Sequence, residues 1–490
     1  MGIWSKLAVE DVRGESLQAD SAGSLHRSLG ATSLAAFGVG AIVGAGIFAV
    51  TGTAAAEYAG PAIVLSFIIA ASVCLCPALC YAELAAMIPV SGGAYSYAYI
   101  ALGELPAWVV GWSLVCEFLF AAATISVSWS AYLVSVLKMA GLDAPRMFVS
   151  APVTLDPSRH LHLSGAIVNL PAALMALVIG AVVLGGSRAS ARVNNVIVAI
   201  KLAVLVAFIG FGAFYVRPNN WTPFIPPNLG STGHFGWSGI LRAAGVIFFS
   251  FLGFDCVSTA AREARNPSRD TPLGLLGSLV VCTVLYIAVA FVLTGLSPYR
   301  ALGVADPLIA ALQYAGPALA FLRPLVGIGA VIGLTSVMLV LLFALSRIFH
   351  SMARDGLLPM SIGRIHPATA VPSVGIGIAA VATAILGALL PIELLSELIS
   401  IGTLFAFLAV CVSVLLLRRS QPSLARPFSV PCAPVVASIG AIACAYLMIS
   451  LPLDTWLRFL GWMLVGLVIY WAYGHRRTVA AQAARLTPTG

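Results

Sequence analysis

Four glycines interrupt the first long apolar stretch of the sequence, and their spacing has direct chemical consequences. Gly38, Gly40, Gly44 and Gly46 fall within nine residues. Each glycine inside a helix costs roughly 1 kcal/mol relative to alanine, so the spacing predicts a helix that opens locally and exposes backbone N–H and C=O groups. In lipid, such groups are tolerated only around a ligand or a water-filled cavity. We therefore expect Gly44, Ala45 and Gly46 to form one half of a substrate site.

The other half of the site is expected at Ser250-Phe251-Leu252-Gly253, inside a later apolar segment. That segment comes five segments after the first, and because five is odd, the two halves of the chain would cross the membrane in opposite orientations. Interrupted segments at matching positions of two inverted halves point to a transporter site between them. The alternative is that the glycines only allow close helix packing, as the spacing of Gly40 and Gly44 would. The matched pair of breaks favours a site.

Two ionisable residues lie deep in apolar segments. Lys201 lies about eight residues into segment 193–215, too deep for its ammonium to reach the membrane surface easily. A charged side chain at that depth is costly and is functional by default, the alternative being a fixed salt bridge. Glu117 lies in the middle of segment 106–137, where a carboxylate must be paired or protonated. It is expected either to act on a cation or proton or to be a hydrogen-bonded structural acid.

The elements that position these residues follow from composition. The chain has 490 residues, of which 60% are hydrophobic and 9% charged, and its mean hydropathy is +1.01. A soluble domain carries about 25% charged residues, so this is an integral membrane protein.

Other classes of function are excluded by the distribution of residue types. The net charge of +8 is spread over the loops and forms no basic patch, which excludes nucleic acid as a partner. Eight of the nine cysteines lie in apolar segments and are interpreted as small core residues. The histidines show no metal-ligand spacing, and no nucleophile-base pair is found, so we expect no metal, no cofactor and no enzymatic activity.

Twelve apolar segments are long enough to be membrane-spanning helices, which need roughly 20 residues. They are 32–57, 61–86, 106–137, 166–184, 193–215, 239–261, 273–296, 320–349, 374–391, 394–417, 434–451 and 456–473. If the amino terminus is inside, seventeen Lys and Arg residues lie on the cytoplasmic side and eight outside. Positive loops stay in the cytoplasm, so both termini are predicted to be cytoplasmic.

Five stretches, in order along the chain, resemble the amino acid-polyamine-organocation superfamily of permeases, most closely its cationic amino acid transporter branch. They are Gly40–Phe48, Tyr81–Tyr97, Phe249–Cys256, Asn266–Pro267 and Ser346–Pro359. The resemblance implies an all-α fold with a five-plus-five inverted-repeat core, broken helices one and six, and two further helices. It also implies amino acid uptake by alternating access.

The expected organisation has a cytoplasmic tail, a core of two repeats, two additional helices and a second cytoplasmic tail. The corresponding ranges are 1–28 for the first tail, 29–420 for the core with repeats 29–216 and 236–420, 421–475 for the additional helices, and 476–490 for the last tail.

The resemblance also implies a binding mode for the zwitterionic amino acid backbone. The helix half that restarts at Gly46 offers N–H groups and a positive dipole end to the α-carboxylate. Carbonyls near Ile42 and Val43, and again near Phe249 and Ser250, face the α-ammonium, and Phe249 closes over the bound substrate. The matching substrate-binding positions are Ile42, Gly44, Ala45, Gly46, Phe249, Ser250, Leu252 and Gly253.

Lys201 matches the place in the fifth span that a sodium ion occupies in related sodium-coupled transporters. We therefore expect it to couple transport to protons, with Thr335 and Ser336 as hydroxyl neighbours. Since a similar hydroxyl pair holds sodium elsewhere in this fold, sodium coupling remains an alternative, as does amino acid exchange. A membrane receptor that binds amino acids without transport is the alternative from a different class.

The side chain of the substrate is left open by the sequence. Glu117 could accept a cationic side chain, whereas apolar positions such as Met338 suit neutral ones. The excess of arginine over lysine and the abundance of alanine suggest a bacterial inner membrane.

Overall fold

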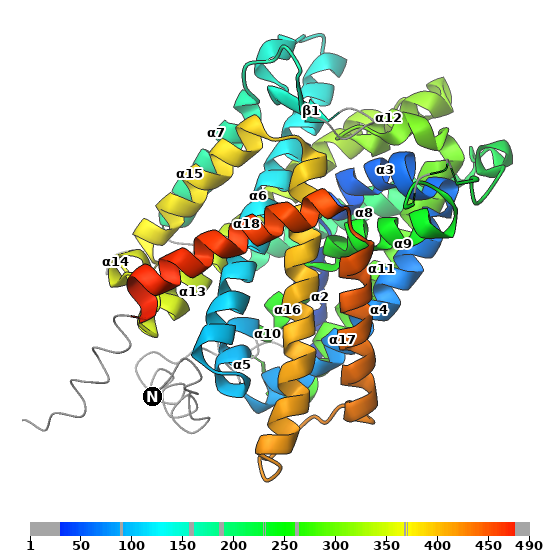
Figure 1. Cartoon of the computed structure of the whole chain (residues 1–490). Coiled ribbons are helices and arrows are strands. Elements are labelled where there is room, and N and C mark those ends of the chain that lie inside the picture. The colour runs from blue at the N-terminus through cyan, green and yellow to red at the C-terminus, as the bar shows by residue number, and fades with distance from the viewer. Residues whose placement is uncertain are drawn as a thin grey trace, which may run out of the picture.

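The computed structural model describes residues 30–475 apart from a few short gaps, and the predicted tails 1–28 and 476–490 lie outside it. The gaps are 89–91, 156–160, 186–190, 229, 231, 260–263, 367–368 and 370. The described chain is almost entirely helical (Figure 1). Within it, eight helical stretches are long and apolar enough to cross a membrane, and four shorter apolar helices accompany them. The predicted all-α membrane fold is confirmed.

The longer helices correspond to the twelve predicted apolar segments. They are α2 (Ala31–Ile42), α4 (Ile63–Met87), α6 (Glu104–Met139), α7 (Leu170–Leu184), α8 (Ala191–Ala213), α9 (Gly236–Val246), α11 (Pro267–Leu296), α13 (Leu322–Arg354), α15 (Ser373–Leu389), α16 (Ile392–Ser420), α17 (Ala433–Ser450) and α18 (Leu453–Ile469).

Shorter elements complete the chain. They are the helices α3 (Thr51–Ala54), α5 (Ala94–Ala101), α10 (Phe254–Thr259), α12 (Pro307–Ala315) and α14 (Met360–Gly363), the π-helical turns Gly46–Val50, Ala55–Ala59 and Tyr470–Gly474, and the 3₁₀ turns Gly60–Ala62, Arg146–Phe148, Pro218–Trp221, Ile247–Phe251, Tyr299–Leu302 and Pro317–Leu319. One antiparallel hairpin, β1 (Val153–Leu155) with β2 (Leu161–Leu163), pairs Val153 with Leu163 in the loop after α6.

The first membrane segment is broken where the glycines predict it. Helix α2 ends at Ile42, Val43 adopts an extended backbone conformation, and helical structure resumes as a π-helical turn at Gly46. A π-helical turn marks a local departure from regular hydrogen bonding and is frequent at functional sites. The break therefore frees backbone groups in the protein interior.

The sixth segment is broken in a corresponding way. Helix α9 ends at Val246, a 3₁₀ turn follows, and Leu252 is extended before α10 begins at Phe254. Gly253 has φ of +114°, a conformation that L side chains rarely adopt. The glycine is thus required by the shape of the break itself.

Three long helices, α6, α13 and α16, form the centre of the scaffold, because α6 packs along both of the others. Helix α11 packs along α2 and α4. In Figure 1, α16 runs vertically through the middle of the molecule, with α17 beside it and α18 crossing in front. The two broken segments lie inside this frame, because α11 contacts α2 and α10, and α16 contacts the 3₁₀ turn of segment six.

Tryptophans attach α18 to α6. The Trp112 and Trp462 rings stack with centroids 5.0 Å apart, and each indole N–H donates to the backbone carbonyl of the other residue, at 2.8 and 3.1 Å. Trp108 also donates to the Gly466 carbonyl at 3.0 Å. The stacked rings and reciprocal bonds fix the last membrane helix to the scaffold.

Candidate functional site

The two breaks meet in the interior of the protein. A Cβ added at Gly46 would lie 2.5 Å from Ser250 Cα, and one added at Gly253 would lie 2.8 Å from the carbonyl carbon of Ala41. Both distances are far below ordinary van der Waals contact, so the absence of a side chain at these positions lets the two backbones touch. The predicted residues of the two half-sites are therefore brought together.

The predicted substrate-binding residues line this junction and are buried. Ala45 is 2% exposed, whereas Phe249 and Leu252 are each 5% exposed. Ser250 is also buried, and its hydroxyl has no hydrogen-bond partner in the described part of the chain. A buried unpaired hydroxyl has free hydrogen-bonding capacity that a bound ligand can use.

Tyr286 of α11 bridges the two breaks and was not predicted from the sequence. Its hydroxyl lies 2.8 Å from the carbonyl oxygen of Ile42 and 3.0 Å from that of Ser250. One O–H group has a single proton, so the two carbonyls share one donor. The carbonyls of Ile42 and Ser250 are also among those expected to face the α-ammonium of a substrate. An ammonium offers three donors, whereas the tyrosine hydroxyl offers one. The only sequence signal for this residue is a tyrosine inside an apolar helix.

Lys201 lies at the carboxyl end of α2. Its ammonium donates to the carbonyl of Gly40 and, at 3.0 Å, to that of Val43, and its side chain is fully buried. The last carbonyls of a helix lack partners within it and carry the negative end of its dipole, so a cation is stabilised there. The predicted link between Lys201 and the first break is present.

Helix α13 packs on this lysine through Gly333, where an added Cβ would lie 3.0 Å from Lys201 Cβ.

The hydroxyls of Thr335 and Ser336, predicted as neighbours of Lys201, form hydrogen bonds with other groups. Thr335 donates to Val331 at 2.7 Å and accepts from the Trp129 indole at 3.1 Å. Ser336 donates to the Gly333 carbonyl at 2.8 Å. Among the described residues, neither hydroxyl bonds to Lys201.

Gly44 lies against Val337 of α13, a residue that was not predicted from the sequence. An added Cβ at Gly44 would lie 3.2 Å from Val337 Cγ1. The neighbouring Met338 is fully buried. The wall opposite the first break is therefore apolar.

Hydroxyl groups hold the π-helical turn Gly46–Val50, with which the second half of segment one begins. Tyr132 of α6 donates to the Phe48 carbonyl at 2.6 Å, and Thr51 donates to the Gly46 carbonyl at 2.9 Å. These bonds fix the π-helical turn that begins at the junction.

Glu117 is fully buried between α6 and α16. A Cβ added at Gly402 would lie 3.5 Å from Glu117 Cβ, and the hydroxyl of Thr403 donates to Ile399 instead. Neither carboxyl oxygen has a hydrogen-bond partner within the described ranges. Since a bare buried carboxylate is costly, this group needs a proton or a partner that binds during function. Its link to segment six runs through α16, where Ser400 donates to the Val246 carbonyl at 2.6 Å.

An acidic residue outside the membrane helices is also perturbed. Asp306, which precedes α12, accepts a hydrogen bond from Ser135 at the end of α6. Burial raises the pKa of Asp306 to about 6, although the bond from Ser135 lowers it. Helix α12 packs against α3 and the π-helical turn of segment one, so this carboxyl lies beside the second half of that segment.

An almost entirely helical membrane chain whose two interrupted helices meet in its interior has the architecture of a permease. Comparison with known proteins agrees. The sequence matches the family model described as Amino acid permease over residues 29–471. The chain therefore belongs to the amino acid permease family, in the amino acid-polyamine-organocation superfamily, and is a multi-pass membrane permease and not an enzyme.

Individual relatives cover nearly the whole chain. It is 41% identical over 466 residues to the methylthioribose transporter of Bacillus subtilis (strain 168), covering 95% of this chain and 97% of that protein. It is 41% identical over 456 residues to the branched-chain amino acid permease BcaP of the same organism, covering 93% and 94%. The chloroplastic cationic amino acid transporter 9 of Arabidopsis thaliana is 38% identical over 407 residues, covering 83% and 69%.

Proposed function

We propose that this permease imports neutral amino acids by alternating access and that Lys201 couples the transport to protons. The observation that carries the proposal is the bond from the buried Lys201 ammonium to the Gly40 and Val43 carbonyls at the end of α2. A proton on this lysine holds the first break in its present shape. Loss of the proton removes the cation that those carbonyls bind, so that the first break is free to rearrange.

Substrate binding uses the junction of the two breaks. The α-carboxylate binds to the N–H groups where helical structure resumes at Gly46. The α-ammonium replaces the Tyr286 hydroxyl at the carbonyls of Ile42 and Ser250, because three charged donors satisfy two acceptors better than one neutral donor does. The unpaired Ser250 hydroxyl adds a further contact.

The walls of the junction favour an apolar side chain on the substrate. Phe249, Leu252 and Val337 are apolar and buried, and Val337 lies directly opposite Gly44. Branched-chain amino acids suit such a wall, and a branched-chain amino acid permease is one of two relatives at 41% identity, the other being a methylthioribose transporter. Glu117 packs against Gly402 of α16, on the scaffold side of the junction, and our proposal gives it no role in binding the side chain.

Sodium coupling is disfavoured by the same contacts. The hydroxyls of Thr335 and Ser336 are bonded to carbonyls of their own helix, and the lysine ammonium lies where a cation would bind the end of α2. Two positive charges at that position would repel each other. A proton on Lys201 therefore takes the role of the coupling ion.

We further propose that both termini are cytoplasmic, in a bacterial inner membrane, and that ranges 29–216 and 236–420 form the two inverted repeats, followed by two additional helices within 421–475. The excess of positive residues on one side supports this topology. Labelling of single cysteines in intact cells by an impermeant reagent tests it, because the loop after α6 should react and the loop after α16 should not.

The central test is uptake into proteoliposomes. The wild type should accumulate radiolabelled leucine when the outside is acidic, and Lys201→Ala should not accumulate it although passive exchange of leucine across the membrane can continue. Lys138→Ala is the matched control, since Lys138 lies at the exposed end of α6 and should leave accumulation unchanged. Accumulation by Lys201→Ala that depends on the pH gradient would refute proton coupling by this residue. Binding without any uptake by the wild type would indicate a receptor.

A further inference from the structure

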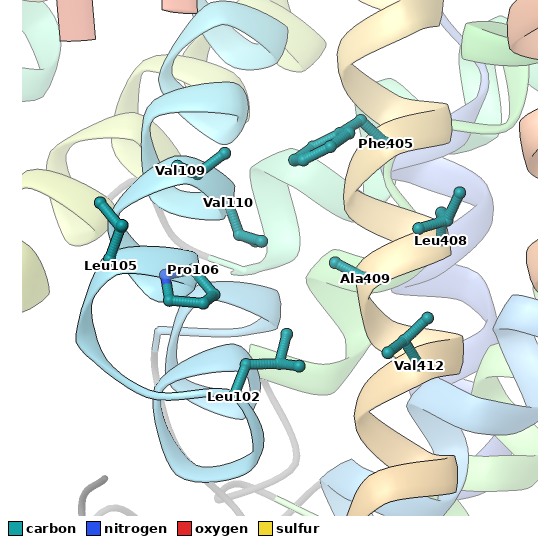
Figure 2. A pocket seen from close by; sticks show the side chains of 9 residues that line it. All are labelled: Leu102, Leu105, Pro106, Val109, Val110, Phe405, Leu408, Ala409 and Val412. Carbon is teal, nitrogen blue, oxygen red and sulfur yellow. The ribbon is translucent and has the colours of Figure 1, made fainter. Parts of the chain in front are cut away.

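An apolar groove runs between the beginning of α6 and the second half of α16, away from the substrate site. Its volume is about 290 Å³, at or below the small end of the usual range for ligand pockets, roughly 300–1,000 Å³. Figure 2 shows Leu102, Leu105 and Val109 on one wall and Phe405, Leu408 and Val412 on the other. The side chains that line it are all apolar.

The groove opens from the membrane-facing side of the helices. In this part of α16, Phe405, Leu408 and Val412 are only partly buried, whereas Ala409 at the base is 5% exposed. The groove lies toward the start of α6 and the end of α16, and therefore near one surface of the bilayer. The predicted topology makes this the cytoplasmic surface.

A positive charge lies beyond the groove on the same face of α16. Arg419 comes seven residues after Val412, which is two helical turns or about 10.5 Å along the helix. It is exposed, and in the described part of the chain it forms no ion pair or hydrogen bond. The adjacent Arg418 instead binds the buried Glu83 carboxylate at 3.0 and 2.5 Å.

We propose that this groove binds one anionic phospholipid of the inner leaflet, with an acyl chain between α6 and α16 and the phosphate at Arg419. An acyl chain matches a lining without polar side chains, and the bilayer supplies it at high concentration. The headgroup charge complements Arg419, which is unpaired among the residues that the structure describes. A free phosphate has no acyl chain to fill the apolar groove, and a peptide helix is wider than a space of this volume.

The proposed lipid would act as a spacer between two scaffold helices. Phe405, on one wall, also contacts the Phe459 ring of α18, with centroids 5.9 Å apart. Ser400 on the same helix α16 bonds to Val246 at the start of the second break. The lipid would therefore support α16, which bonds to the start of the second break.

The test is lipid retention by the purified full-length protein. Wild type and variants are equilibrated with phosphatidylglycerol or phosphatidylethanolamine in mild detergent, and bound lipid is counted by native mass spectrometry. Wild type should retain one phosphatidylglycerol in preference to phosphatidylethanolamine. Arg419→Ala should bind it roughly fivefold more weakly, the effect of one basic residue at a lipid surface.

Three further variants complete the test, one that fills the groove and two that serve as controls. Ala409→Phe should fill the base of the groove and abolish retention of the lipid. Arg364→Ala, which removes an exposed arginine elsewhere on the predicted cytoplasmic side, and Val284→Phe, at a 64% exposed position of α11, should leave retention unchanged. Equal retention by Arg419→Ala and wild type, equal binding of the two lipids, or a co-purifying polypeptide that Ala409→Phe displaces would overturn the proposal.

Discussion

Replacement of Gly46 by alanine should weaken substrate binding strongly, because this glycine lets the two broken segments touch. The added Cβ would lie 2.5 Å from Ser250 Cα, and ordinary contact begins near 3.4 Å. A backbone atom cannot rotate away as a side chain can, so the two breaks would have to separate by about 1 Å. Overpacking of this kind typically costs about 1–3 kcal/mol, which corresponds to an affinity loss of roughly 5-fold to 150-fold.

The assay compares three glycines in one purified protein. Dissociation constants are measured by calorimetry for the amino acid that stabilises wild type best in a thermal-shift panel. Gly44→Ala should be milder than Gly46→Ala, since its Cβ meets only the Val337 side chain at 3.2 Å. Gly210→Ala, where nothing lies within 4 Å, should bind as wild type does. The reasoning fails if Gly46→Ala, purified as a monodisperse protein, binds with unchanged affinity or if Gly44→Ala is the more damaging change.

Three further predictions concern single side chains. Tyr286→Phe removes the hydroxyl that competes with the substrate ammonium, so binding should tighten about fivefold while the empty protein loses about 1 kcal/mol of stability; calorimetry that shows weaker binding would contradict the competition. Burial raises the pKa of Asp306 to about 6, above its unfolded value of about 3.9, so the folded protein binds the additional proton. The apparent melting temperature should therefore rise as pH falls from 6 toward 4, and an identical rise in Asp306→Asn would exclude this carboxyl as the cause. Arg418→Ala leaves the buried Glu83 carboxylate without its main partner and should cost about 3–5 kcal/mol, whereas the neighbouring Arg419→Ala should leave the melting temperature nearly unchanged.

The fold and the positions of both breaks could be predicted because their causes are local. Apolar segments of sufficient length cross the membrane, and glycines weaken the helix at the residues where they occur, as Gly46 and Gly253 show. The depth of Lys201 in its segment could be predicted in the same way. These features depend on chain composition over a few turns and not on which helices become neighbours.

The remaining features depend on contacts between distant segments. The sequence does not distinguish Tyr286 from any other tyrosine in an apolar helix. Its role follows only from the packing of α11, which places its hydroxyl at both breaks. Thr335 and Ser336 were expected beside Lys201, yet a hydroxyl in an apolar helix bonds readily to a carbonyl three or four residues earlier, and both do so. Glu83 lies in a buried ion pair with Arg418, a partner more than 300 residues away that no local pattern could identify.

The attachment of the last helices to the scaffold has a consequence for how the protein could be divided. Without α18 and the π-helical turn that follows it, the indole N–H groups of Trp108 and Trp112 would lose their carbonyl partners, and Glu104 would lose the Tyr470 hydroxyl at 2.8 Å. At the opposite end of α18, Glu397 would lose Thr455 at 2.7 Å. A ten-helix fragment would thus expose polar groups to hydrocarbon at both ends of the missing helix. Co-expression of that fragment with a separate α17–α18 hairpin should restore an intact permease from two pieces, with these four bonds directing the assembly.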